Sequence, residues 1–335
     1  MAWGFFSSIY NKALPGLCFL NLSLLHVETR TAYPLITEQM VRRDVQKSAP
    51  KAVKAKSQAV GRPKGSLNKN RTDVALSPFQ TQLQGCIRSA LTLIGLDLGI
   101  LYFVYDGALG NNAGLQAVKQ AGLHLICKLR HDSTLYFPYA GEYSGKGKPR
   151  KYGEKLRLET LTAENLKIET VEKNIRTRVY QMQVWHKNFP ELLNVAIIVK
   201  TNLKTGRTAK VLLFSDDLNL ASETLIDYYS LRFQIEFNFR DAKQYWGLED
   251  FMNVRETQVS NAANFSLFMV TFSQLLSAKI ERVNRASILD LKTIFRARKY
   301  TRRIINSLGK NAEEFYIDDR IFQAAEIGRI HAKPA

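Results

Sequence analysis

Residues 79–130 carry an alternation of helical and extended patterns that few folds can accommodate. Apolar residues recur at helical spacing and then in a short continuous run, and the pair of patterns is repeated, over residues 79–96, 100–105, 111–122 and 124–130. Helix, strand, helix, strand is the order of α/β proteins, in which helices cover the faces of a central sheet. The chain is therefore expected to contain an α/β sheet.

Asp106 directly follows the first of these two strands, in the sequence YFVYDGALGN. Sheets of this class place their chemistry at the carboxyl ends of strands, so Asp106 is a candidate catalytic and metal-binding carboxylate. An Asp-Gly pair is also a common turn former, and this alternative gives Asp106 a structural role only.

A second candidate carboxylate lies in the run YYSLRFQIEFNFRDAKQYW, where four residues form the pattern Y-x2-R-x3-E-x6-K: Tyr229, Arg232, Glu236 and Lys243. At about 100° per residue, these side chains fall within roughly 60° of one another on a helix expected over residues 221–245. Arg240 lies close to the same face. The alternative is an ordinary amphipathic helix whose acids and bases pair in solvent.

This set of side chains suits phosphate chemistry. Glu236 can hold a divalent metal ion, and Arg232 and Lys243 can bind phosphate oxygens. Tyr229 can position a nucleic-acid backbone through its hydroxyl group. Because carboxylate oxygens are hard ligands, the expected cofactor is Mg²⁺ or Mn²⁺.

The charge of the chain points to a polyanionic partner. The formal net charge is +18 and the sequence pI is near 9.8, while 45% of the residues are hydrophobic. Such a chain folds around a core and carries its charge outside, with nucleic acid as the first candidate partner. The three cysteines show no CxxC spacing, which fits a reducing cytoplasm. The apolar stretch 265–278 is too short for a membrane span, so no membrane contact is expected.

Two segments concentrate the basic residues. Residues 41–71 are poor in large apolar side chains and contain GRPKG, in which Gly61, Arg62 and Pro63 resemble the core of an AT-hook. Arg62, with Lys64, would then bind in the DNA minor groove; a charged linker and a compartment-targeting signal are the alternatives. The second segment, RARKYTRR at 296–303, is either a solvated surface or a further DNA contact, and its tight clustering favours the contact.

The Y-x2-R-x3-E-x6-K pattern resembles the signature of DDE transposases of the insertion-sequence-4 group, and YFVYDGALGN is similar to that family's second-aspartate motif. The resemblance implies an RNase H-like fold and cut-and-paste DNA transposition by metal-dependent phosphoryl transfer. It gives Asp106 and Glu236 the roles of catalytic metal ligands. The implied partners are double-stranded DNA, as transposon ends and target, and a second copy of the chain in a homodimeric synaptic complex in the nucleoid.

The family's first catalytic aspartate has no counterpart in this sequence. Residues 1–16 contain no Asp or Glu. Three other aspartates stand in unsuitable places: Asp44, Asp73 and Asp97. We therefore expect a transposase truncated at its amino terminus, which lacks the first strand and has little or no activity.

Asp216 and Asp217, in LLFSDDLNL, are rival catalytic acids because they also follow a strand pattern. A role in capping the next helix explains them as well and is favoured, with Asp217 or Asn219 as the cap.

The expected organisation is an RNase H-like α/β domain, without its first strand, interrupted by a β-rich insertion before the glutamate helix. A hairpin is expected over residues 17–36, with its turn near residues 26–29. The expected segments are a residual hairpin at residues 1–40, a basic linker at 41–78 and a core with Asp106 at 79–131. They are followed by the insertion at 132–215, the helices with Glu236 at 216–284 and a basic tail at 285–335.

Two other functions stay open: a non-catalytic DNA-binding transposase remnant, and an RNA-binding module.

Overall fold

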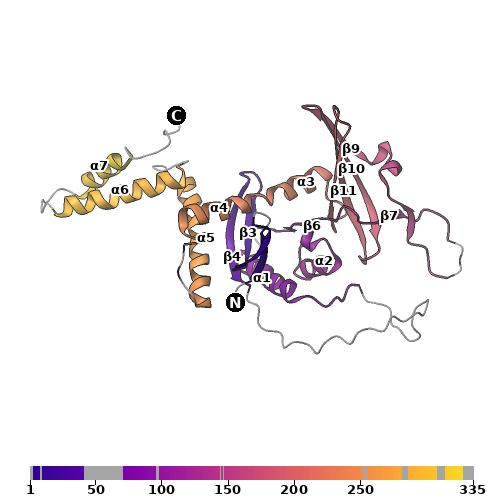
Figure 1. Cartoon of the computed structure of the whole chain (residues 1–335), viewed down its shortest axis with the longest axis horizontal. Coiled ribbons are helices and arrows are strands. Elements are labelled where there is room, and N and C mark those ends of the chain that lie inside the picture. Colours follow the sequence, from indigo (N-terminus) through magenta and orange to yellow (C-terminus); the bar gives the residue numbers. More distant parts are fainter. Residues whose placement is uncertain are drawn as a thin grey trace. The chain divides into compact units, whose positions relative to one another are not determined.

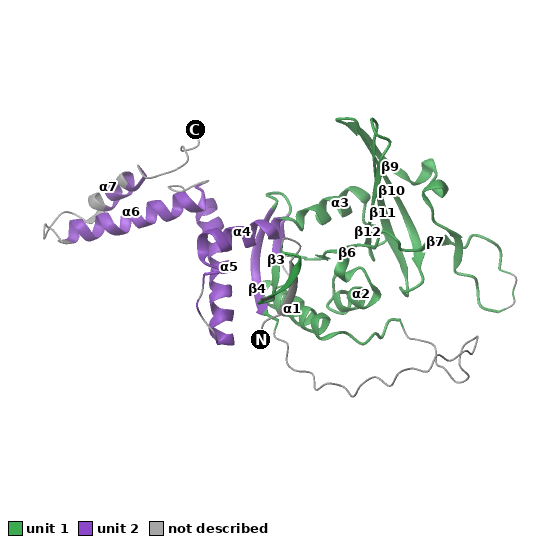
Figure 2. Cartoon of the chain, viewed as in Figure 1, with its two compact units in different colours: residues 1–22, 27–30, 39–233 green, residues 23–26, 31–38, 234–335 purple. Residues whose placement is uncertain are grey.

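The computed structural model describes residues 3–7, 10–40, 71–95, 98–143, 145, 147–250, 252, 255–280, 286–307 and 314–326. The chain divides into two compact units, which Figure 2 shows in different colours. Unit 1 comprises residues 1–22, 27–30 and 39–233, and unit 2 comprises residues 23–26, 31–38 and 234–335. The division at residues 233 and 234 falls inside the region that the sequence predicts as one helix.

Unit 1 is a mixed α/β unit (Figure 1). Its described helices are α1 (Pro78–Ile94), α2 (Asn112–Lys119) and α3 (Ser222–Leu231), with three short 3₁₀ turns, η1 (Gly107–Leu109), η2 (Leu158–Thr160) and η3 (Ala163–Asn165). Its strands are β1 (Trp3–Ser7), β2 (Lys12–Gly16), β5 (Tyr102–Val104), β6 (His124–Lys128), β7 (Leu135–Pro138), β8 (Tyr152–Lys155), β9 (Leu166–Glu172), β10 (Ile175–His186), β11 (Leu192–Asn202) and β12 (Thr208–Ser215).

Eight of these strands form one mixed sheet in the order β5-β6-β12-β11-β10-β7-β8, with β9 paired to β10. Strands β5 and β6 are parallel, and the other described pairs of neighbouring strands in the sheet are antiparallel. The helix, strand, helix, strand order expected over residues 79–130 is confirmed by α1, β5, α2 and β6. The β-rich character expected over residues 132–215 is confirmed too, and its strands extend the sheet of β5 and β6, whereas the status of this region as an insertion stays a prediction.

The amino end of α1 shows why the first helix begins at residue 78. Ser77 accepts a hydrogen bond from the Gln80 backbone N–H at 3.3 Å, and the Gln80 side chain accepts one from the Ser77 N–H at 2.9 Å. Pro78 occupies the first helical position, where its missing N–H has no partner to lose. Gly95 ends the helix with φ of 79°.

Helices cover the sheet around β6, and Figure 1 shows α3 on one side of this strand and α2 on the other. Ile126 of β6 belongs to a buried cluster with side chains from β11, β12 and α3 and from the turn before α3: Ala196, Leu213, Leu220 and Leu225. Burying such side chains contributes on the order of 2 kcal/mol each. One part of the core of unit 1 therefore lies where β6 and β12 meet α3.

The hairpin expected over residues 17–36 is confirmed as β3 (Phe19–His26) and β4 (Thr31–Gln39), which form a two-stranded sheet. The turn lies one residue later than expected, because residues 27–30 form it and Arg30 has a positive φ of 53°. Arg30 donates to the Asp227 carboxylate at 2.7 Å and to the Ser230 hydroxyl at 3.0 Å, both on α3.

Unit 2 contains most of β4 and four helices, α4 (Gln234–Trp246), α5 (Glu256–Lys279), α6 (Ile288–Ser307) and α7 (Glu314–Glu326). Helix α5 is bonded to β4 through its side chains: Asn264 donates to the Thr37 carbonyl at 3.0 Å, and Thr271 to the Pro34 carbonyl at 3.2 Å. Within the described ranges, no helix is long and apolar enough to cross a membrane.

The prediction of one helix over residues 221–245 is wrong. Helix α3 ends at Leu231 and α4 begins at Gln234. At the break, the Arg232 N–H bonds to the Tyr229 carbonyl at 3.3 Å and the Phe233 N–H to the Ser230 carbonyl at 3.2 Å. These contacts reach back three residues instead of four, which tightens the last turn and ends the α-helical ladder.

Candidate active site

Asp106 lies two residues beyond β5, at the carboxyl end of a strand, as the sequence predicts. Its side chain is exposed, and one carboxylate oxygen accepts the Ala108 backbone N–H at 2.9 Å. Asp106 thereby caps the 3₁₀ turn η1. Asp106 therefore combines the capping role expected of an Asp-Gly turn with an exposed carboxylate.

The backbone that follows Asp106 is held tightly against the end of β6. The Cys127 thiol donates to the Asp106 carbonyl at 2.7 Å. Gly110 lies so close to β6 that a Cβ atom on it would stand 2.3 Å from the Lys128 carbonyl oxygen. Since backbone atoms cannot move aside easily, only glycine fits, and this fixes the segment that carries the carboxylate.

Tyr229 and Arg232 of the predicted signature lie near Asp106 within unit 1. The Arg232 guanidinium lies 5.9 Å from the centre of the Tyr229 ring. Burial raises the pKa of Tyr229, the charge of Asp106 raises it further, and the charge and hydrogen bond of Arg232 oppose this shift. The same two charges act on Tyr105, whose pKa is raised mainly by burial. The structure therefore brings the aspartate, the tyrosine and the arginine into one electrostatic neighbourhood.

Two residues of this neighbourhood were missed at the level of sequence. Tyr105 precedes Asp106, and Cys127 lies on the adjacent strand β6. Burial raises the pKa of the Cys127 thiol to about 12, so the group stays a protonated hydrogen-bond donor near neutral pH. The signal that could have found them is the parallel pairing of β5 with β6, which sets residues 22 positions apart side by side.

The other signature residues lie on α4, in unit 2. Glu236 is exposed in the first turn of α4. Lys243 pairs with Glu249, and Arg240 pairs with Asp241 at 2.9 Å while its guanidinium stacks 4.9 Å from the centre of the Phe237 ring. These pairs lie on the surface, where ion pairs contribute roughly 0–1 kcal/mol, so a phosphate group could displace the carboxylates. The meeting of Glu236 with Asp106 stays a prediction.

Asp216 and Asp217 lie at the opposite end of β5 and β6 from Asp106. The Asp216 carboxylate accepts the Leu125 N–H at 2.7 Å and lies 2.9 Å from His124 Nδ1 at the start of β6. Asp217 accepts the Tyr102 hydroxyl at 2.7 Å. Burial pushes the pKa of Asp217 up, but the hydrogen bonds from Tyr102 and the Asn219 amide and the charge of His124 bring it below the ordinary value. Both acids therefore serve to join strands.

The predicted helix caps are also wrong. The residue before α3 is Ala221, which offers no side-chain cap. Instead the Gln181 side chain, from β10, accepts the Ser222 N–H at 3.0 Å and donates to the Leu220 carbonyl at 2.7 Å. A side chain distant in sequence takes the place of the local cap.

The donor chemistry of Asp106 and Glu236 fits a hard divalent cation, because both are exposed carboxylates. Among the described residues, however, no three Asp, Glu, His or Cys side chains form a group that could hold a metal ion. Each unit contributes one of the two predicted ligands. The GRPKG segment, with Arg62 and Lys64, lies outside the described residues.

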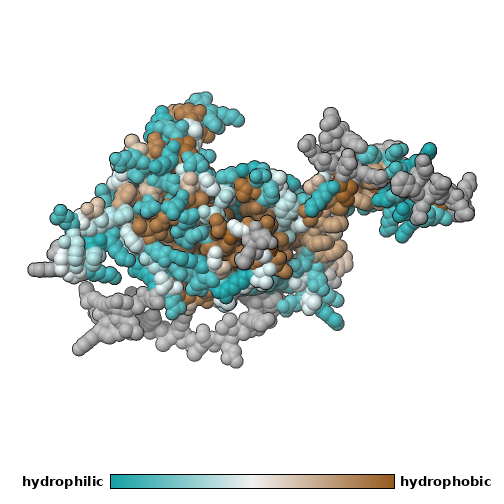
Figure 3. Space-filling view, turned by 180° about the vertical axis from the view of Figure 1, so that it is seen from behind, coloured by the Kyte–Doolittle hydropathy of each residue, from teal (hydrophilic) through white to brown (hydrophobic). Residues whose placement is uncertain are grey.

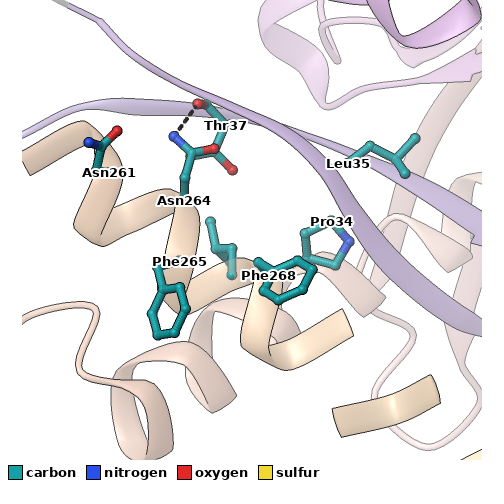
Figure 4. A pocket seen from close by; sticks show the side chains of 8 residues that line it. Pro34, Leu35, Thr37, Asn261, Asn264, Phe265 and Phe268 are labelled. Atoms are coloured by element: carbon teal, nitrogen blue, oxygen red, sulfur yellow. Dashed lines mark hydrogen bonds between the residues drawn. The ribbon is translucent and has the colours of Figure 1, made fainter. Parts of the chain in front are cut away.

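A pocket of about 400 Å³ lies within unit 2 between β4 and α5 (Figure 4). Its lining consists of aliphatic, aromatic, hydroxyl and amide groups: Pro34, Leu35, Thr37, Asn261, Asn264, Phe265, Leu267 and Phe268. Because this lining contains no titratable side chain, the pocket offers neither a charged metal ligand nor an acid or base for phosphate chemistry.

Comparison with known proteins gives one family. A family model described as DDE superfamily endonuclease matches residues 3–189, which is more than half of the chain and includes Asp106. No curated protein matches the sequence. The matched residues include β5, the strand that leads to Asp106, and end before Glu236. This chain belongs to the DDE superfamily endonucleases.

Proposed function

We propose that this protein is a transposase of a bacterial insertion sequence, of the insertion-sequence-4 group, that binds double-stranded DNA and catalyses cut-and-paste transposition. The observation that carries the proposal is that the charges of Asp106 and Arg232 both act on Tyr229, so that an exposed carboxylate, a cation and a hydroxyl share one electrostatic neighbourhood in a DDE superfamily endonuclease. The substrate is DNA because the family cuts phosphodiester bonds and the chain carries a net charge of +18.

In this proposal Asp106 and Glu236 hold Mg²⁺ or Mn²⁺. When bound, such a cation activates the attacking oxygen and stabilises charge on the leaving oxygen. Arg232 binds phosphate oxygens and Tyr229 positions the DNA backbone through its hydroxyl group. Burial raises the pKa of this hydroxyl further above neutral, so it acts as a protonated group.

Other cations also bind the duplex, Lys243 near the cleavage point and Arg62 with Lys64 outside it. Lys243 and Arg240 are exposed on α4 and exchange their surface carboxylate partners for phosphates. Arg62 and Lys64 add affinity through the minor groove. Two copies of the chain bring the two element ends together in a synaptic complex.

The test is a cleavage assay on the full chain with Mn²⁺ and a duplex that carries the element end. The expected result is strand cleavage, which would show that the family's first aspartate is unnecessary or replaced in this chain. Asp106→Asn and Glu236→Gln should each reduce the cleavage at least about 100-fold, since each removes one anionic ligand. Glu256→Gln is the matched control, because Glu256 is likewise an exposed acid in the first turn of a helix. Equal losses in the control, or full activity in both site variants, would refute the assigned roles.

A second candidate function is a non-catalytic DNA-binding protein derived from a transposase. It is favoured because no three Asp, Glu, His or Cys side chains of the described residues form a group that could hold a metal ion. Salt-sensitive duplex binding without metal-dependent cleavage would identify this function.

A further inference from the structure

The basic cluster of α6 separates onto two faces of the helix. At about 100° per residue, Arg296, Lys299 and Arg303 fall within roughly 60° of one another. Arg298 and Arg302 fall on the opposite side, about 200° and 240° from Arg296. We define the outer face of α6 as Arg296, Lys299 and Arg303, and the inner face as Arg298 and Arg302.

The inner face serves the fold of unit 2. Arg298 pairs with Asp318 of α7, and Arg302 donates to the other oxygen of the same carboxylate at 2.8 Å. Elsewhere along the two helices, α6 and α7 share a buried apolar cluster that includes Leu291, Ile294 and Phe322. The two inner arginines therefore join α6 to α7 through a shared carboxylate.

The outer face has no such role. Its three cations are not buried, and none of them forms an ion pair with another described residue. The single acid of α6, Asp290, is fully buried in the first turn, where it bonds to Ser287. In Figure 3, hydrophilic side chains lie over the α6 and α7 end of the chain.

Like charges at spacings of three and four residues repel each other and destabilise a helix by a few tenths of a kcal/mol per pair. A partner that carries negative charges at similar intervals removes this repulsion. The outer face spans about 10 Å, at 1.5 Å per residue, which is close to the extent of a few consecutive phosphates on one DNA strand. Tyr300 lies on the same side and is 54% exposed, so it can add a hydroxyl contact.

We propose that the outer face of α6 binds the phosphate backbone of duplex DNA. This inference rests on the proposed function for its substrate, and it adds a binding surface that is separate from Asp106 and Glu236. Phosphate contacts carry no base sequence, so the surface holds and orients the duplex regardless of the element end. Single-stranded RNA offers the same charge and is a separate outcome of the test.

The test compares two variants of the full chain that lose the same charge. Arg296→Gln/Lys299→Gln/Arg303→Gln removes the outer face, whereas the control Lys204→Gln/Arg207→Gln/Lys210→Gln removes three exposed cations from the β11–β12 hairpin of unit 1. Affinity for a duplex of unrelated sequence is measured between about 50 and 200 mM salt.

The plot of log K against log salt has a negative slope, and each lost phosphate contact reduces the magnitude of this slope by about 0.9, so three lost contacts reduce it by about 2.7. Over this fourfold range of salt, the affinity of the unmodified chain should fall about 40-fold more than that of the outer-face variant. The control should keep the original slope. The inference is overturned if the outer-face variant behaves like the control, or if it loses affinity for single-stranded RNA but not for duplex DNA.

Failure of the outer face as a binding surface can be distinguished from failure of the proposed function. Metal-dependent cleavage by the unmodified chain, together with an unchanged slope in the outer-face variant, would keep the function and remove this surface. A reduced slope without any cleavage would keep the surface and remove the catalytic assignment.

Discussion

At the scale of single residues, the position of Asp106 depends on close backbone packing. The turn after Asp106 has room only for glycine at position 110, because a Cβ atom there would meet the Lys128 carbonyl. The thiol of Cys127 holds the Asp106 carbonyl from the same strand. The carboxylate is therefore placed by contacts of its backbone and of the turn that it caps, while the side chain itself is exposed.

Gly110→Ala should destabilise the protein by roughly 1–3 kcal/mol, because the added methyl group forces the turn away from β6. Gly85→Ala is the matched control. Gly85 is exposed in the middle of α1, and a methyl group added there would meet no atom within 4 Å, so alanine should stabilise the helix by about 0.5–1 kcal/mol. Urea denaturation measures both. Changes of the same sign in the two variants would contradict the close approach at Gly110.

Tyr102 should make stability depend on alkaline pH. Burial, followed by the hydrogen bond to Asp217 and its charge, raises the pKa of Tyr102 from about 10 to about 12. The folded chain then keeps a proton that the unfolded chain releases, so this contribution is complete below pH 10 and is lost as pH rises towards 12.

The measurement is the urea midpoint as a function of pH for the unmodified chain and for Tyr102→Phe. The variant should be less stable near neutral pH, because the Asp217 carboxylate loses a donor, and should decline less steeply between pH 10 and 12. Tyr143→Phe, at a side chain that is 56% exposed, should keep the original slope. Parallel curves for all three proteins would contradict the shift.

At the scale of elements, α3 is held at its amino end by strands and not by its own sequence. Asn194, which is 1% exposed on β11, donates to the Asp217 carbonyl at 3.0 Å and to the Leu220 carbonyl at 2.8 Å. It also accepts from Gln181 at 2.9 Å. This buried amide network fixes where β12 ends and α3 starts, and so where Tyr229 and Arg232 lie.

Asn194→Ala should destabilise the protein by about 1–3 kcal/mol, because the Asp217 carbonyl loses its donor while the Leu220 carbonyl keeps only its bond from Gln181. Gln183→Ala provides the control, since Gln183 is exposed and donates to the nearby Leu218 carbonyl at 3.2 Å. The control should change stability by less than about 0.5 kcal/mol. Urea denaturation of both variants decides the matter, and a small effect at Asn194 would mean that the network is dispensable.

The break between α3 and α4 belongs to the same scale. The interval Y-x2-R-x3-E-x6-K predicts one helical face only if the helix is continuous, and the three-residue hydrogen bonds at Arg232 and Phe233 interrupt it. Tyr229 and Arg232 lie at the end of α3, whereas Glu236 lies in the first turn of α4. The pattern indicates the residue types, but not a shared face.

At the scale of the whole molecule, charge is distributed unevenly along the chain. Residues 41–70 contain nine Lys or Arg and one Asp, which supplies +8 of the net +18. The outer face of α6 adds three further cations in unit 2. Long-range attraction to a polyanion is therefore built into separate parts of the chain, which is consistent with a protein that holds a long substrate.

The division of the chain into units could not be foreseen from these patterns. Hydrophobic periodicity reports which side of an element is buried, but not which elements pack together, because packing depends on contacts between residues far apart in sequence. In the sequence, all strands of the large sheet lie between the hairpin of β3 and β4 and helix α5. Asn264 of α5 nevertheless donates to the Thr37 carbonyl of β4.

The sequence by itself determined the order of α1, β5, α2 and β6, the β-rich region that follows, and the placement of Asp106 at a strand end, because local periodicity and turn chemistry dictate these features. Only the tertiary structure decided that Tyr229 and Arg232 share an electrostatic neighbourhood with Asp106, that Asp216 and Asp217 join strands, and that the inner cations of α6 pair with α7. These outcomes depend on which groups are buried together, since burial decides whether a charge is paired within the protein or left for a partner.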